Sequence, residues 1–223
     1  MQAVSYKVKN IVKEAFVYLL LALGTFGMLL TAAQYFSFRD DTGFLQFKQG
    51  YLHIAVWKIA FYVHVFSAVV ALLAGFTQFS NDLLKKHRSL HRALGKIYVA
   101  DILFINFPAG MIMAVYANGG LPSKAAFIIL DLLWFFFTWK AVHAARNKKI
   151  SLHREYMIRS YALTCSAVTL RTWKIIFSHS MHIEPGLLYM IDAWMGFVPN
   201  LLFAEWLIRK RGMKLLPVKR KVI

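Results

Sequence analysis

The chain has 223 residues, of which 59% are hydrophobic, and its mean hydropathy is +0.51. Soluble domains are only about 45–50% apolar, so this composition excludes an ordinary water-soluble protein. A formal charge of +17 would suggest nucleic acid as a partner in a soluble protein. Here the basic residues lie between apolar runs, where they indicate membrane topology instead. We therefore expect one integral membrane domain over residues 1–223, with the lipid bilayer and not nucleic acid as its partner.

Six apolar runs follow one another along the chain, each about as long as the ~20 residues that a helix needs to cross a bilayer. Lipid offers the backbone no hydrogen-bond partners, so each run is predicted to be helical and the fold to be an all-α polytopic membrane bundle. The predicted spans are 15–36, 55–79, 97–117, 125–145, 157–177 and 187–208. The core is predicted over 55–178, with 15–36 and 187–208 as flanking helices. Pro108 and Pro199 lack a backbone donor, so both are expected to interrupt their helices.

The basic residues favour one orientation of this bundle. They gather before the first span, between the second and third, between the fourth and fifth, and after the sixth. Short loops rich in Lys and Arg stay in the cytoplasm, so both termini are predicted to be cytoplasmic and the protein to lie in the inner (cytoplasmic) membrane of a cell. The basic tail, residues 209–223, is also expected to contact anionic lipid.

One tetrapeptide occurs twice, as Ser89-Leu90-His91-Arg92 and as Ser151-Leu152-His153-Arg154. Each copy lies just before a helix that is predicted to run from the inside to the outside. Serine is a good N-cap residue, so both copies are predicted to begin helices with serine as the cap.

Four ionisable side chains lie at a similar depth in the outer half of the predicted spans: His64, Asp131, Arg171 and Asp192. An ionisable group that faces lipid is costly, so these groups should turn into the bundle and meet there. Two interpretations stay open. One is a structural ion pair between Asp131 and Arg171, and the other is a site for a polar head group, a quinone or protons.

Two histidines lie near the inner ends of neighbouring predicted helices. His91 shares a helix face with Gly95 and Tyr98, while His153 begins a similar stripe on the fifth helix. Such a pair suits the axial ligation of haem b, with Gly95 opening space, and it would also suit a transition-metal ion. The alternative is that both histidines face lipid head groups at helix starts.

Several of these residues fall into motifs with a family resemblance. The motifs are His64…Gly75-x-x-Gln78-Phe79, His91-Arg92-x-x-Gly95-Lys96-x-Tyr98, His153-Arg154…Met157-x-Arg159-Ser160-Tyr161 and Thr169-Leu170-Arg171. They resemble an uncharacterised bacterial family of membrane proteins that has no established activity. More distantly, the layout is similar to the two-haem membrane cytochromes of the cytochrome b561 and ferric reductase groups. That second resemblance implies paired histidines on alternate helices.

In this resemblance His91 and His153 match one histidine pair of those cytochromes. The other pair is incomplete, because His64 stands on the second helix but Asp131 occupies the corresponding depth of the fourth. The resemblance therefore implies at most one haem site, on the inner side.

Three functional hypotheses follow. The first is a b-type cytochrome-like membrane oxidoreductase, with one haem b at His91 and His153 and an outer site for quinone or protons at His64, Asp131, Arg171 and Asp192. The second is a small carrier, or a lipid- or solute-binding membrane subunit without a cofactor. The third is a membrane enzyme that uses His91 and His153 as metal ligands.

Overall fold

The computed structural model describes residues 2–79, 86–180 and 183–215, and all regular secondary structure within these ranges is helical. The first part comprises α1 (Gln2–Ala33), η1 (Gln34–Ser37), η2 (Gly43–Tyr51), α2 (Ala55–Phe76) and η3 (Thr77–Phe79). The second comprises α4 (Arg88–Ala100), the π-helical η4 (Asp101–Asn106), α5 (Phe107–Val115), α6 (Gly120–Arg146), α7 (Ile150–Thr164) and α8 (Ser166–Ser180). The last comprises α9 (Pro185–Met195) and α10 (Val198–Leu215).

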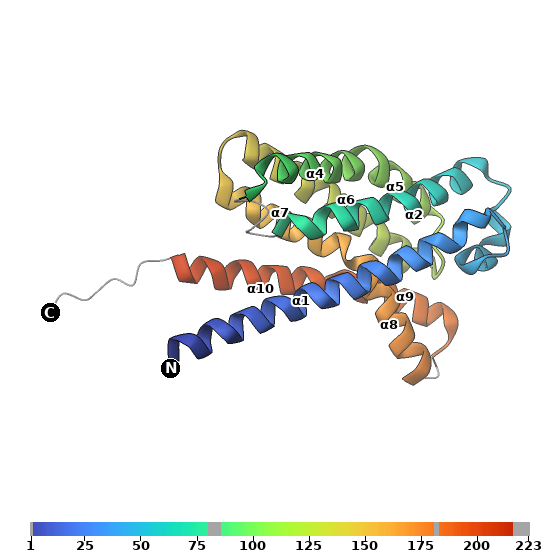
Figure 1. The fold of residues 1–223 in the computed structure, drawn as a ribbon. Helices are drawn as coiled ribbons and strands as arrows, with labels where there is room; N and C mark the ends of the chain where they lie inside the picture. Colours follow the sequence, from blue (N-terminus) through green and yellow to red (C-terminus); the bar gives the residue numbers. More distant parts are fainter. Residues whose placement is uncertain (1, 80–85, 181–182, 216–223) are drawn as a thin grey trace.

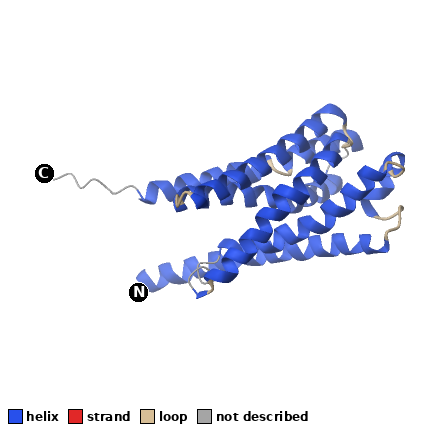
Figure 2. Cartoon of the chain, turned by 90° about the horizontal axis from the view of Figure 1, so that it is seen from above, coloured by secondary structure: helices blue, strands red, loops and turns tan. Residues whose placement is uncertain are grey.

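The helices run largely along one direction and form an elongated bundle (Figures 1 and 2). α2, α4, α5, α6 and α7 lie together, and α1 and α10 follow one side of them (Figure 1). α8 and α9 form a hairpin that leaves the bundle at an angle (Figure 1). α1 begins and α10 ends at one end of the bundle, whereas the connection between α1 and α2 lies at the opposite end (Figure 1).

Five helical stretches in the described residues are long and apolar enough to cross a membrane: Tyr18–Ser37, Ala55–Phe79, Arg88–Val115, Gly120–Arg146 and Pro185–Lys210. They coincide with the first, second, third, fourth and sixth predicted spans. Many large apolar side chains on them are exposed, as a lipid-facing surface requires. The part of the chain that the structure describes is therefore all-helical and has the apolar spans of a membrane protein.

The fifth predicted span differs from expectation and leaves the count of six unconfirmed. A break at Cys165 divides it into α7 and α8, each of 15 residues, which is shorter than a single spanning helix. Serine and threonine side chains surround the break. The hydroxyl of Thr164 donates to the carbonyl of Ser160 (3.1 Å), and the Thr169 hydroxyl lies 3.2 Å from the carbonyl of Cys165. Such bonds compete with the helical backbone pattern and bend helices.

The predicted interruption is present at Pro199, whereas Pro108 lies inside a stretch that stays helical from Arg88 to Val115. Pro199 is the second residue of α10, where its missing N–H is no loss, and α9 has already ended at Met195. Pro108 is the second residue of α5, directly after the π-helical segment.

The repeated tetrapeptide begins helices in both places, as predicted. α4 starts at Arg88 and α7 at Ile150, each one residue before the repeated serine. The prediction that the serines are N-caps was wrong, because the backbone already leaves helical geometry at His87 and Lys149. These two residues take the N-cap position, and neither makes a side-chain cap bond.

α2 packs closely against α4 and α7 at Gly75. A Cβ atom at this position would lie 2.5 Å from the ring of Tyr161 and 2.9 Å from that of Tyr98, so α2 can approach α4 and α7 only because the residue is glycine. The Tyr98 hydroxyl makes hydrogen bonds with Ser160 (2.8 Å) and Thr164 (2.7 Å). These buried bonds join α4 to α7 inside the bundle.

Candidate functional site

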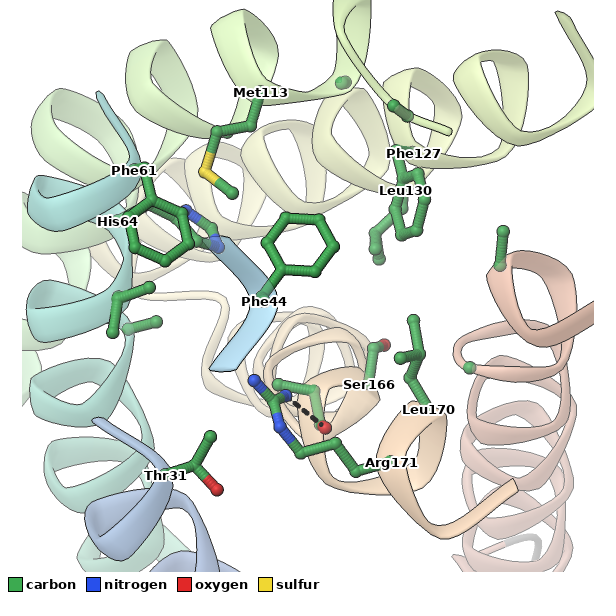
Figure 3. Close-up of a pocket in the computed structure, with 18 of the residues that line it drawn as sticks. Thr31, Phe44, Phe61, His64, Met113, Phe127, Leu130, Ser166, Leu170 and Arg171 are labelled. Carbon is green, nitrogen blue, oxygen red and sulfur yellow. Dashed lines mark hydrogen bonds between the residues drawn. The ribbon is translucent and has the colours of Figure 1, made fainter. Parts of the chain in front are cut away.

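A cavity of about 640 Å³ lies among α1, α2, α5, α6, α8 and α9. The connection between α1 and α2 contributes Phe44 and Lys48 to its wall, which places the cavity toward the end of the bundle away from the start of α1. Figure 3 shows Phe44 reaching into the space between His64 and Arg171. Most of the remaining wall is apolar, with Phe61, Leu130 and Leu170 among its side chains.

All four residues predicted for the outer site line this one cavity. His64 comes from α2, Asp131 from α6, Arg171 from α8 and Asp192 from α9. The structure therefore brings together residues that are far apart in the sequence.

Arg171 and Asp131 do not form the ion pair that one interpretation of the sequence required. The ion pairs among the described residues are Arg39–Asp41, Lys58–Asp40 and Arg159–Glu205, all outside the cavity. The Nη1 atom of Arg171 instead donates a hydrogen bond to the carbonyl oxygen of Ala167, over 2.9 Å (Figure 3). The interpretation as a structural ion pair was thus wrong, and the two charges stand apart on different helices.

Several polar atoms at the cavity are buried without a hydrogen-bond partner in the described structure. They are Nδ1 of His64, Oδ2 of Asp131, Oγ of Ser166 and Oδ1 of Asp192. The residues Asp131, Ser166 and Asp192 are only 5%, 4% and 4% exposed. Leaving one such group unpaired costs about 1–3 kcal/mol, and more for a charged group. Their gathering around one cavity indicates a place that accepts polar atoms of another molecule.

Lys48 bonds the α1–α2 connection, which lines the cavity, to the connection between α5 and α6. Its side chain is 2% exposed, and Nζ donates to the carbonyl of Tyr116 (2.5 Å) and to Oδ1 of Asn118 (2.6 Å). Burial, and to a smaller extent the positive charge of Lys124, lowers the pKa of Lys48 to about 8. The ammonium group thus ties two connections at this end of the molecule together.

Three cavity residues escaped the sequence analysis as site residues: Lys48, Ser166 and Lys174. Lys48 is the only basic residue in an aromatic-rich connection, Phe44–Tyr51, and that isolation was the available signal. Lys174 lies one helical turn after Arg171, and its Nζ is 5.7 Å from the centre of the Phe47 ring. Ser166 lines the cavity from the first turn of α8, directly after a break that the sequence did not reveal.

The predicted inner site lies elsewhere. His91 lies on α4 and His153 on α7, and neither residue lines the cavity. The Nδ1 atom of His153 is 2.9 Å from the carbonyl oxygen of Ala141. A Cβ atom at Gly95 would lie 3.1 Å from Oε1 of Gln78, so the Gln78 side chain takes the space that Gly95 was expected to open.

Tyr98 is fully buried between α4 and α7, with its hydroxyl bonded to Ser160 and Thr164. No group of three or more His, Cys, Asp or Glu side chains is placed to hold a metal ion within the described ranges. Binding of haem b, or of a metal ion by His91 and His153, stays a prediction.

Comparison with known proteins gives one match. A family model with the description "Predicted membrane protein (DUF2306)" matches residues 61–208, which include every residue of both predicted sites. No curated protein and no solved structure matches the chain.

Proposed function

Because the chain belongs to this DUF2306 family of predicted membrane proteins, we propose that it is a carrier or ligand-binding subunit of the cytoplasmic membrane that takes an amphipathic molecule into its cavity. The apolar tail of the ligand would lie against the apolar wall. Its polar head would reach His64, Asp131, Arg171 and Asp192. We infer from the basic loops that both termini are cytoplasmic, which would place the cavity in the outer half of the membrane.

One observation carries the proposal: buried polar atoms without partners surround a cavity that is otherwise apolar. Ligand sites commonly have this composition, an apolar lining with a few convergent polar groups, and volumes of roughly 300–1,000 Å³. Ionisable residues inside a membrane protein also mark ligand or ion pathways more often than purely structural positions.

The interrupted helices give further support to a carrier. The breaks between α7 and α8 and between α9 and α10 both border the α8–α9 hairpin, which supplies Arg171 and Asp192 to the cavity. Transporters favour discontinuous helices at their binding sites, because freed backbone groups and helix ends can then contact a substrate. The proposal does not require a haem, because neither His91 nor His153 lines the cavity.

The test is to fill the cavity and measure binding. Ala68 lines the cavity, so Ala68→Phe should occupy part of the space and abolish saturable binding of a single-chain amphiphile. Val70 lies on the same helix and is 45% exposed, so Val70→Phe is the matched control and should bind as the wild type does. Native mass spectrometry of purified protein, with increasing amphiphile, measures the bound fraction. Equal binding by both variants would disprove the proposal.

A further inference from the structure

The charges of the cavity also restrict the head group of its ligand. Resting on the proposed function, we propose that the head group is zwitterionic, with an anionic group held by Arg171 and a cationic group held by Asp131. A primary ammonium joined to a phosphate or a carboxylate has this chemistry.

The positive wall is formed by α8. The guanidinium of Arg171 has five N–H donors, and its one hydrogen bond in the described structure goes to the Ala167 carbonyl. Figure 3 shows the guanidinium directed toward the middle of the cavity, beneath Phe44. The remaining donors are free to bind two oxygens of one phosphate or carboxylate, the geometry in which arginine binds anions most strongly.

The negative wall is formed by α6 against α5. The Asp131 carboxylate packs on Gly110, where a Cβ atom would lie only 3.0 Å from Oδ1. The carboxylate therefore lies close against α5 at this position, and a larger residue at 110 would displace it. Oδ2 of Asp131 has no partner, so this wall can accept hydrogen bonds from an ammonium group.

The other charged groups at the cavity differ in their contacts. Lys48 has two oxygen acceptors of its own, whereas Oδ1 of Asp192, like Oδ2 of Asp131, has no hydrogen-bond partner. Arg171 and Asp131 line one cavity without forming an ion pair. His64, between Phe61 and Phe44 in Figure 3, adds a ring nitrogen without a partner.

This separation of charge selects among head groups. A purely anionic head would compensate Arg171 but would be repelled by Asp131, and a purely cationic head would meet the reverse situation. A zwitterion compensates both, and a buried charge is costly while it is unpaired. A hydrogen bond to a charged group contributes about 1.5–3 kcal/mol, so each lost contact should weaken binding about tenfold or more.

The experiment compares three probes that carry the same alkyl chain: a lysophosphatidylethanolamine, a lysophosphatidic acid and an alkylamine. Each is titrated onto the full chain in lipid nanodiscs and measured by native mass spectrometry. The wild type should bind the zwitterion about tenfold more tightly than either of the others. Arg171→Gln should shift the preference to the alkylamine, and Asp131→Asn should shift it to the lysophosphatidic acid. Arg39→Gln, at an exposed arginine outside the cavity, should leave the order unchanged.

The outcomes separate the two claims. Equal affinity of the wild type for all three probes, or an equal loss for all three in both cavity variants, overturns the zwitterionic head group while the cavity still binds amphiphiles. If no probe shows binding that Ala68→Phe abolishes, the proposed function and this inference are both overturned.

Discussion

The hydroxyl of Thr169 donates a hydrogen bond to the backbone carbonyl of Gly196 over 2.5 Å, and so joins the breaks in two different helices. Thr169 lies in the first turns of α8, and Gly196 lies between α9 and α10. The amide of Asn200 adds bonds to the Ala162 carbonyl and to the Thr169 hydroxyl, both of 3.0 Å. The α8–α9 hairpin, with Arg171 and Asp192, is thereby positioned by a polar junction.

We predict that Thr169→Val destabilises the protein by about 0.5–1.7 kcal/mol, the range measured for hydrogen bonds between membrane helices. The substitution keeps the side-chain volume but removes the donor to Gly196 and the acceptor for Asn200. Unfolding in mixed micelles with increasing sodium dodecyl sulfate measures the change. Thr172→Val is the control, since Thr172 is exposed and bonds only within its own helix. Equal effects of the two substitutions would show that the junction adds nothing.

We predict that Gly75→Ala destabilises the bundle by about 1–3 kcal/mol, as overpacking of a filled core does. The added methyl group would collide with the rings of Tyr161 and Tyr98 and push α2 away from its neighbours. The same unfolding titration measures this effect. Gly27 of α1 has no atom within 4 Å of an added Cβ, so Gly27→Ala should be neutral or slightly stabilising. A neutral Gly75→Ala would contradict the close helix packing described above.

Lys48 should give the protein a stability that rises with pH. Burial lowers its pKa from 10.5 to about 8 in the folded state, so between these values the unfolded chain binds more protons than the folded one. Stability contributed by this group therefore increases from about pH 8 to about pH 10.5. The neutral amine still has two N–H groups, enough for the carbonyl of Tyr116 and the amide oxygen of Asn118.

The test of this pH dependence is the melting temperature of the wild type and of Lys48→Met across the same alkaline range. The variant should lack the part of the rise that Lys48 contributes. Lys149→Met, at an exposed residue in the connection between α6 and α7, should keep the wild-type slope. Identical slopes for Lys48→Met and the wild type would show that Lys48 is protonated to the same degree in both states.

The sequence predicted the helical membrane fold well because apolar run length is a strong signal for a chain that lies in lipid. The span Ala55–Phe79 was predicted with both of its ends, and Pro199 indicated the start of α10. The break at Cys165 was missed because it depends on serine and threonine hydroxyls that bond to nearby carbonyls and to Gly196. Such residues also occur in unbroken helices, so their presence alone does not fix a break.

The cavity was predictable in part. The depth of His64, Asp131, Arg171 and Asp192 along their helices indicated that they should meet, and all four line one space. Whether Asp131 and Arg171 pair across that space depends on the direction of α8 after the break. No local sequence pattern predicts that direction. The contribution of the α1–α2 connection to the cavity could not be predicted either, because the bond partners of Lys48 lie 68 and 70 positions away in the sequence.

A double-mutant cycle between Asp131 and Arg171 tests the central claim most directly, namely that opposite charges stand unpaired across a cavity. The free energy of unfolding is measured without added amphiphile for the wild type, Asp131→Asn, Arg171→Gln and the double variant. Two residues that share no contact should be additive within about 0.5 kcal/mol, and we predict that result. A coupling energy of about 2 kcal/mol or more would show that the two side chains pair directly and that the proposed site is closed.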